Sequence, residues 1–232
     1  MPTTQAETSQ KNNHITGEAI ALLASGGLDS TILLKELLRD YKFVYPFYVT
    51  NGNIWEKSEE YWLRRFLKAF DTNRLKPLTL LSIPMEDLYK NFWAVTGRKV
   101  PGPHSKTEAV YLPGKNILLI AKAAVCCVQK KIRKVALAPL KTNPFPDDKR
   151  KFFDPYERAL SAGFGFPFKI VTPFLNLTKR EVMQKGRALP LHLTFSCLNP
   201  KGRLHCGKCN KCEERKQAFA SIQMLDPTKY VG

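Results

Sequence analysis

Hydrophobic positions along the chain follow two periods, one typical of buried strands and the other of amphipathic helices. Short apolar or β-branched runs predict strands at 19–24, 42–50, 78–83, 134–140 and 168–172. Apolar residues that recur every three or four positions predict helices at 30–39, 56–70, 86–93, 115–130, 152–162 and 178–188. Because strands and helices alternate, we expect a parallel sheet covered by helices on both faces.

The expected organisation is one doubly wound, Rossmann-like α/β domain. The length of 232 residues suits one such domain with an appended element better than two full domains. A flexible polar tail is expected over 1–17 and the α/β domain over 18–190. The segment 191–232 would pack on that same domain.

Two polar loops interrupt the pattern of helices and strands. Residues 96–114 carry three prolines and three glycines, and a second, proline-containing loop spans 141–151. Long loops without regular structure are uncommon in compact domains and often carry function. We therefore expect the first of them to lie over one end of the sheet.

Charge and composition narrow the class of protein. Lys and Arg number 37 against 20 Asp and Glu, a formal net charge of +17, which favours anionic partners but also fits a merely solubilising surface. No apolar run approaches the roughly 20 residues that span a bilayer. The stretch MPTTQAETSQKNNHITGE has no apolar core of a secretion signal, so a cytoplasmic protein without membrane association is expected. Its six cysteines are then metal ligands or free thiols.

The stretch SGGLDS, residues 25–30, joins the first strand to the first helix. In this geometry, backbone N–H groups and a helix N-terminus point at an anion. The loop lacks the lysine of a Walker A motif and the spacing of a dinucleotide fingerprint. Asp29 could cap the helix or hold Mg²⁺ near phosphates. The alternative is a simple turn capped by Ser30.

Four cysteines near the C-terminus have the spacing of metal ligands. They are Cys197, Cys206, Cys209 and Cys212, and four thiolates satisfy a tetrahedral zinc ion. An iron–sulfur cluster is the competing interpretation, because C-x-x-C-x-x-C also begins ferredoxin-type motifs. Zinc is favoured, since Glu213 rather than proline follows the last cysteine. With four sulfurs present, His205 is expected to be a neighbour rather than a ligand.

These motifs resemble those of known enzymes. Ser25–Ser30 match in full the S-G-G-x-D-S loop of ATP pyrophosphatases, which cleave ATP between the α and β phosphates. Together with the C-terminal segment, the chain is similar to the 7-cyano-7-deazaguanine synthases of queuosine and archaeosine biosynthesis. The further matches are Pro113-Gly114-Lys115-Asn116, Ser196-Cys197, His205-Cys206-Gly207, Cys209, Cys212, Arg215 and Ala218-Phe219.

The resemblance implies a fold, a reaction and a set of site residues. The fold would be that of the adenine-nucleotide α-hydrolases. The reaction would be that of an ATP-dependent ligase, which adenylates 7-carboxy-7-deazaguanine, a small deazapurine carboxylic acid, and joins it to ammonia on the way to the nitrile. Mg²⁺ would accompany ATP and Zn²⁺ would be structural. ATP would bind Ala24, Ser25, Gly26, Gly27, Leu28, Asp29, Ser30 and Thr31, and the acid Gly52, Lys115, Asn116, Phe145 and Asp147.

Two loops depart from the family pattern where the substrate should be recognised. The family commonly has D-Y-G-Q-R-H after the second strand, and residues 50–55 keep only its glycine, Gly52. After the fourth strand, residues 142–149 keep an aromatic and the Pro-Asp pair of Y-S-G-Y-P-D-C-R. The chain therefore has the features of a divergent subgroup, for which a related acid is an alternative substrate.

Other functions stay open at this point. A tRNA sulfur-transferase shares the ATP loop but usually needs a reactive cysteine, and Cys126 and Cys127 lie in an apolar helix where burial would make them inert. A nucleic-acid-binding module with a zinc ribbon would leave the complete SGGLDS string without a role. Nucleic acid is thus not the expected partner, although the net charge leaves it open. The sequence also leaves open whether the protein forms a homodimer.

Overall fold

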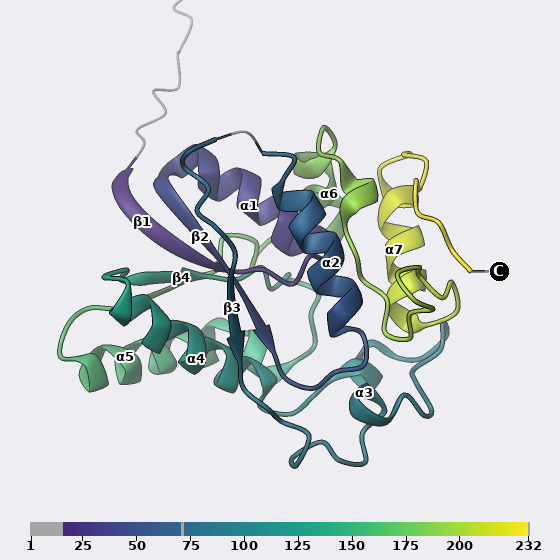
Figure 1. Cartoon of the computed structure of the whole chain (residues 1–232), viewed down its shortest axis with the longest axis horizontal. Helices are drawn as coiled ribbons and strands as arrows, with labels where there is room; N and C mark the ends of the chain where they lie inside the picture. The colour runs from purple at the N-terminus through teal and green to yellow at the C-terminus, as the bar shows by residue number, and fades with distance from the viewer. Residues whose placement is uncertain (1–15, 71, 232) are drawn as a thin grey trace, which may run out of the picture.

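A five-stranded parallel sheet forms the centre of the protein (Figure 1). The computed structural model describes residues 16–70 and 72–231. The strand order is β3-β2-β1-β4-β5, and all four pairs of neighbours are parallel. The strands are β1 (Thr16–Leu23), β2 (Tyr41–Thr50), β3 (Thr79–Ser82), β4 (Lys134–Ala136) and β5 (Lys169–Val171). The predicted fold class is confirmed.

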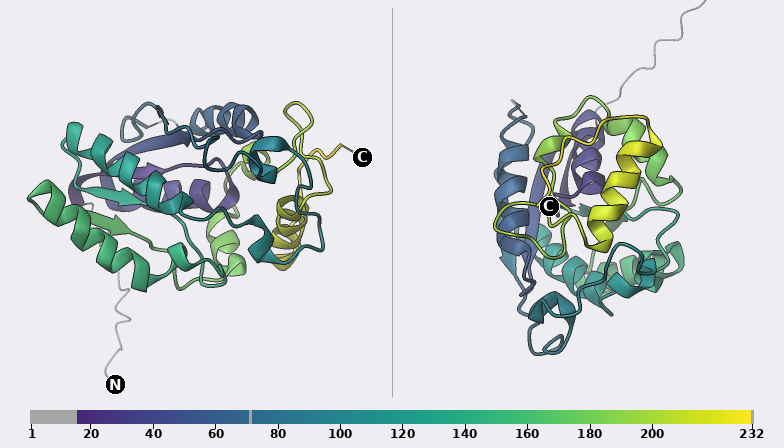
Figure 2. Two further views of the ribbon diagram at one scale, coloured as in Figure 1. Left: turned by 90° about the horizontal axis from the view of Figure 1, so that it is seen from below. Right: turned by 90° about the vertical axis from the view of Figure 1, so that its right-hand side faces the viewer.

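Helices cover both faces of this sheet (Figures 1 and 2). One face carries α1 (Leu28–Asp40), α2 (Glu56–Leu67) and α6 (Lys179–Gly186), and the other carries α4 (Lys115–Gln129) and α5 (Arg150–Phe164). The short α3 (Trp93–Thr96) and the C-terminal α7 (Asn210–Ser221) lie beyond the end of the sheet at which β1 and β2 finish. Single 3-10 turns occupy Thr107–Val110, Pro146–Asp148 and Leu191–Leu193.

The alternation of side chains along β1 creates the two halves of the core. Ile20 and Leu22 pack with α1, α2 and α6, whereas Ala21 packs with α4 and α5. All three are fully buried. Successive strand residues point to opposite faces, so an apolar run without polar positions is what a strand covered on both sides requires.

The predicted elements hold except in one region and at several ends. Residues 86–92 form turns instead of the predicted helix over 86–93, and only Trp93–Thr96 is helical. Two apolar side chains of that range, Tyr89 and Trp93, instead pack in a small core beneath the cysteine segment. The first helix begins two residues earlier than predicted, at Leu28. The helix α7 was not predicted.

The C-terminal segment is joined to the domain by a buried arginine. Arg215 on α7 is 1% exposed, and its guanidinium donates to Thr228 Oγ1 at 2.6 Å, Thr194 Oγ1 at 2.7 Å and the Leu191 carbonyl at 2.9 Å. Its plane lies over Phe219 of the same helix. Because each nitrogen of this buried guanidinium is hydrogen-bonded, Arg215 holds α7, the segment Leu191–Thr194 and the segment around Thr228 in one arrangement.

Residues 1–15 of the expected tail lie outside the described residues, and the strand β1 already includes Thr16 and Gly17. Among the helices that the structure describes, none combines the length and apolarity that a membrane span requires.

Close packing of α1 on α6 generates a stability prediction. A Cβ at Gly186 would lie 2.4 Å from Ile32 Cγ1, and Ile32 is fully buried. Gly186→Ala should therefore lower the free energy of unfolding by about 1–3 kcal/mol, the usual cost of overpacking. Urea denaturation measures it. The matched control is Gly163→Ala on α5, where a Cβ meets no atom within 4 Å, and stability should stay the same or rise. Equal stability of the two variants would contradict close packing at Gly186.

Candidate active site

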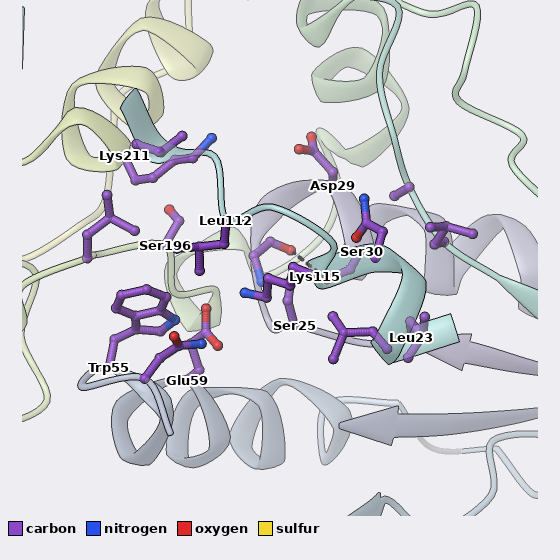
Figure 3. Close-up of a pocket in the computed structure, with 18 of the residues that line it drawn as sticks. Leu23, Ser25, Asp29, Ser30, Trp55, Glu59, Leu112, Lys115, Ser196 and Lys211 are labelled. Carbon is purple, nitrogen blue, oxygen red and sulfur yellow. Dashed lines mark hydrogen bonds between the residues drawn. The ribbon is translucent and has the colours of Figure 1, made fainter. Parts of the chain in front are cut away.

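A pocket of about 390 Å³ opens at the carboxyl ends of the strands (Figure 3). Its wall contains residues that follow β1, β2 and β4, together with the N-terminal ends of α1, α2 and α4 and the segment 195–198. In a doubly wound sheet, ligands bind outside the carboxyl ends of the strands, where the strand order reverses. Here that point is β1, which lies between β2 and β4.

The loop between β1 and α1 presents backbone donors to this pocket. Gly26 adopts φ +77°, and a Cβ there would lie 3.2 Å from the Cβ of Leu63. Gly27 is the N-cap of α1 and makes no side-chain cap hydrogen bond. The first N–H groups of a helix have no acceptor within it, so those of α1 are available to an anion. Neither Asp29 nor Ser30, the two residues considered as alternative caps, caps this helix.

Most of the predicted ATP residues line the pocket. They are Ala24, Ser25, Gly27, Leu28, Asp29 and Ser30. The Ser25 and Ser30 hydroxyls lie 3.1 Å apart, close enough to be bridged by one phosphate oxygen. Gly26 and Thr31 stand behind this lining: the Gly26 carbonyl accepts from Phe195 N at 2.8 Å, and Thr31 Oγ1 donates to the Gly27 carbonyl at 2.9 Å.

A chain of alternating charges runs along one side of the loop. Lys179 Nζ, on α6, lies 2.7 Å and 2.9 Å from the two carboxylate oxygens of Asp29 and 3.1 Å from Glu214 Oε1. Lys211 pairs with the other oxygen of Glu214. Burial alone would lower the pKa of Lys179, but Asp29 and Glu214 outweigh it and raise the pKa. Burial alone would raise the pKa of Glu214, but Lys211 and Lys179 outweigh it and lower the pKa to about 2. Lys179 and Glu214 are therefore both charged near neutral pH.

The opposite wall holds a second set of titratable groups. Glu59 of α2 accepts a hydrogen bond from Tyr48 Oη at 2.9 Å, and Lys115, the first residue of α4, lies over the Trp55 ring at 5.7 Å. Burial raises the pKa of Glu59 to about 7, despite the opposing effects of Lys115 and Tyr48. Burial also lowers the pKa of Lys115. These groups have weaker charge compensation than the Asp29 side of the pocket.

The predicted substrate residues are brought together, with one exception. Lys115, Asn116, Phe145 and Asp147 line the pocket, and Gly52 does not. Gly52 instead supports it from behind, since its N–H donates to Glu56 Oε2 at 3.3 Å and a Cβ there would lie 2.3 Å from the side chain of Glu86.

The two neighbouring aspartates differ in how fully they are bonded. Asp148 accepts from the side-chain amides of Asn116 and Asn143, each at 2.8 Å. Asp147 is 5% exposed, and its carboxylate accepts from no side chain among the described residues; it accepts from backbone N–H groups, its own and that of Asn116 at 3.3 Å. Burial raises the pKa of both. Asp147 thus offers unused acceptor capacity beside the stacked rings of Tyr111 and Phe145, whose centroids are 5.2 Å apart.

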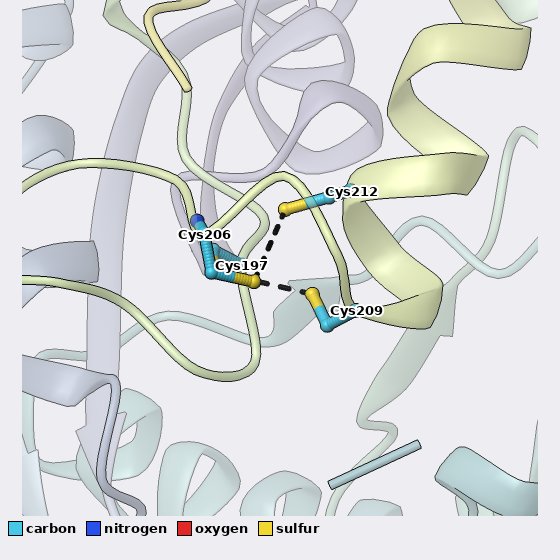
Figure 4. A group of neighbouring side chains, drawn as sticks. All are labelled: Cys197, Cys206, Cys209 and Cys212. Atoms are coloured by element: carbon cyan, nitrogen blue, oxygen red, sulfur yellow. Dashed lines mark hydrogen bonds between the residues drawn. The ribbon is translucent and has the colours of Figure 1, made fainter. Parts of the chain in front are cut away.

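The four predicted cysteines form one buried cluster (Figure 4). Their sulfur atoms all lie within 4.8 Å of one another, with 3.9 Å between Cys206 and Cys212 and 4.0 Å between Cys197 and Cys209. Four sulfurs around one tetrahedral zinc ion, each about 2.3 Å from it, are about 3.8 Å apart. The set could therefore hold one metal ion. His205 is not a member of this set, and its Nε2 accepts a hydrogen bond from Ser196 N at 3.2 Å.

Sequence reasoning missed several pocket residues. They come from three different helices: Glu59 from α2, Lys179 from α6, and Lys211 and Glu214 from α7. Each has the sequence appearance of an ordinary charged position on an exposed helix face. The one available signal was the position of Glu59 just after the loop that follows β2, close to where the sheet was expected to bind a ligand.

Solved structures resemble this chain only at low sequence identity and with TM-scores below 0.5. The NMN synthetase from Francisella tularensis is 14% identical with a TM-score of 0.46, covering 91% of this chain and 80% of that one. The U34-tRNA thiolase NcsA from Methanococcus maripaludis, solved with its 4Fe-4S cluster, is 11% identical with a TM-score of 0.48, covering 89% and 68%. Likenesses at this level carry no information about activity.

Relatives of similar length are considerably closer. The 7-cyano-7-deazaguanine synthase of Methanothrix thermoacetophila is 28% identical over 230 residues, covering 92% of this chain and 99% of the relative. The 7-cyano-7-deazaguanine synthase 1 of Desulfitobacterium hafniense is 30% identical over 206 residues, covering 86% and 90%. The sequence model described as queuosine biosynthesis protein QueC matches residues 18–223, which span the SGGLDS loop, the pocket and the cysteine cluster. The chain belongs to the QueC family of queuosine biosynthesis proteins.

Proposed function

We propose that this protein converts 7-carboxy-7-deazaguanine and ammonia into 7-cyano-7-deazaguanine at the expense of two ATP molecules. The observation that carries the proposal is the convergence, in one pocket, of an anion-binding loop on one side and an under-bonded carboxylate beside stacked rings on the other. Such a pocket can hold a nucleotide phosphate chain and a flat heterocycle at once.

ATP would bind with its phosphates on the SGGLDS loop. The N–H groups at the start of α1 and the hydroxyls of Ser25 and Ser30 supply donors to pyrophosphate as it leaves. Lys179 supplies a positive charge next to the loop. Mg²⁺ would enter with the phosphates and add Lewis-acid stabilisation, and Asp29 is the carboxylate of the loop that could bind it.

The acid would lie between Lys115 and Asp147. The lysine ammonium can neutralise the reacting carboxylate, which brings its oxygen to the α-phosphate of ATP. The free acceptor capacity of Asp147 suits the N–H groups of a guanine-like edge. Phe145, stacked on Tyr111, offers an aromatic face to the heterocycle.

Adenylation makes the reaction possible because a carboxylate oxygen is a poor leaving group. Attack of one carboxylate oxygen on the α-phosphorus releases pyrophosphate, and ammonia then displaces AMP to give the amide. A second adenylation, on the amide oxygen, and loss of AMP yield the nitrile. Aligning the two substrates in one pocket supplies most of the acceleration through proximity.

The cysteine cluster is proposed to hold structural zinc. The sulfur spacing fits one ion, and a four-thiolate set leaves no open coordination position for substrate. The alternative, a tRNA sulfur-transferase, usually needs a reactive cysteine in addition to those of the cluster. Neither Cys126 nor Cys127 lines the pocket, and burial raises the pKa of the Cys127 thiol.

Product formation tests the proposed reaction. Purified enzyme with 7-carboxy-7-deazaguanine, Mg–ATP and ammonium should give the amide first and then the nitrile by mass spectrometry, together with AMP and pyrophosphate. ADP and phosphate should not accumulate. Folded, metal-loaded protein that shows neither product nor release of pyrophosphate dependent on the acid would overturn the proposed function.

Asp147→Ala tests how the heterocycle is recognised. Loss of a hydrogen bond that involves a charged group costs about 1.5–3 kcal/mol, so the KM for the acid should rise about tenfold to a hundredfold. The KM for ATP should change little. Asp154→Ala, an exposed aspartate on α5 that pairs with Arg150, is the control and should leave both constants unchanged. An equal rise in both KM values would remove Asp147 from the acid site.

Metal analysis tests the cysteine cluster. Protein purified without oxygen should contain one zinc ion per chain and no iron. Cys209→Ser should lose the metal and much of the folding stability, since structural zinc contributes an apparent ~10–16 kcal/mol in small zinc peptides. Cys126→Ser, outside the cluster, should keep both. Stoichiometric iron with a visible charge-transfer band would instead indicate an iron–sulfur cluster.

A further inference from the structure

The proposed reaction requires a group that removes protons from nitrogen, and the inference below rests on that proposed function. When ammonia attacks the adenylated acid, the C–N bond forms, the nitrogen loses a proton, and AMP leaves with the electrons of the C–O bond. The amide nitrogen keeps two protons: one is lost when the amide oxygen is adenylated, and the last departs when the second AMP leaves and the C≡N bond forms. A positioned base accelerates such steps by about 10²–10⁴-fold.

Three of the carboxylates that line the pocket are already committed to other partners. Both oxygens of Asp29 bind Lys179, and Glu214 binds Lys179 and Lys211. Glu56 accepts from the backbone N–H groups of Asn51 and Gly52, at 2.6 Å and 3.3 Å. A carboxylate held by cations or by several donors is a weak base.

Three further carboxylates remain in the lining, and their surroundings differ. Asp148 is bonded to two side-chain amides, while its neighbour Asp147 lies beside the Tyr111–Phe145 stack, where the heterocycle is proposed to bind. Glu59 lies on the other wall, near Trp55 and Lys115 (Figure 3). Glu59 therefore lies on the side of the pocket away from Asp147, which is proposed to bind the edge of the heterocycle. It lies next to Lys115, which is proposed to hold the reacting carboxylate.

The geometry of Glu59 suits proton transfer. Its Oε2 accepts from Tyr48 Oη at 2.9 Å, which fixes the carboxylate in place. Within the described chain, no hydrogen bond or ion pair is made to its Oε1. One oxygen is thus anchored and the other is available, the arrangement expected of a general base that is positioned by a neighbour.

We propose that Glu59 is the base that accepts the protons lost from nitrogen as the amide and then the nitrile form. In amide formation Glu59 takes one proton as AMP departs with the C–O electrons. In nitrile formation it takes the two amide protons in turn, the first as the amide oxygen is adenylated and the second as AMP departs. Each time, the electron pair of the N–H bond stays on nitrogen. Between the steps the proton is passed to water, which restores the carboxylate.

The surroundings of Glu59 also predict how activity depends on pH. Burial raises its pKa to about 7, against the opposing influence of Lys115 on α4 and of Tyr48 on β2, while Glu56 on the same helix adds to the rise. The unprotonated form is the active one. Amide formation from the adenylated acid should therefore increase with pH through a limb near pH 7.

Glu59→Gln is the direct test, because glutamine keeps the size and the acceptor for Tyr48 but removes the basicity. Acid-dependent exchange of labelled pyrophosphate into ATP should stay within about threefold of wild type, while amide formation with ammonia should fall by about 10²-fold or more. Hydroxylamine is less basic and is unprotonated at neutral pH, so its reaction should fall less. Glu60→Gln, the next residue on α2, pairs with Arg64 at the surface and should behave as wild type.

Tyr48→Phe provides a second measurement that a purely structural role would not produce. Removing the hydroxyl donor from Glu59 takes away one influence that lowers its pKa, so the limb should move to higher pH. In Glu59→Gln that limb should vanish.

The two proposals fail in distinguishable ways. Wild-type protein that shows no acid-dependent pyrophosphate exchange would overturn the proposed function. Normal exchange together with wild-type amide formation and an unchanged pH limb in Glu59→Gln would overturn the role of Glu59 alone. A variant that loses exchange and amide formation equally would likewise assign Glu59 to binding and overturn its role as base.

Discussion

The hydrogen bond from Phe195 N to the Gly26 carbonyl ties the two halves of the site together. Gly26 occupies the left-handed region, so the chain turns sharply after β1 and its carbonyl faces the C-terminal segment. Phe195 is followed by Ser196, a pocket residue, and by Cys197, a member of the cysteine cluster. A metal ion held by that cluster would therefore fix the wall of the pocket against the ATP loop. This explains how a segment with no catalytic role in the proposal can be essential to the site.

Charge compensation inside the pocket contrasts with the net charge of the chain. The Asp29–Lys179–Glu214–Lys211 network places two acids and two bases beside the loop. The +17 excess therefore acts from elsewhere in the chain and can attract polyphosphate to the pocket by long-range steering. In the proposed reaction, a phosphate of ATP would replace Asp29 as the partner of Lys179.

Much of the fold followed from the sequence because its signals are local. Buried strands produced apolar runs. The SGGLDS loop and the four cysteines could be identified as candidate binding motifs from the type and spacing of their residues. The error at 86–93 has a physical cause: Tyr89 and Trp93 are apolar because they pack in the core beneath the cysteine segment, and their spacing of four residues imitates helical periodicity. Gly52 was expected at the substrate but packs against the side chain of Glu86, a residue 34 positions later. Glu59 and Lys179 acquire meaning only when the sheet brings their helices to one pocket.

The central claim is that the loop after β1 transfers AMP to an oxygen of the acid, and oxygen labelling tests it most directly. The carboxylate of 7-carboxy-7-deazaguanine would be labelled with ¹⁸O in both positions and turned over with unlabelled ATP and ammonium. The account predicts one ¹⁸O in the AMP released with the amide and one in the AMP released with the nitrile, with none in pyrophosphate. AMP without label, or label found in inorganic phosphate, would contradict it.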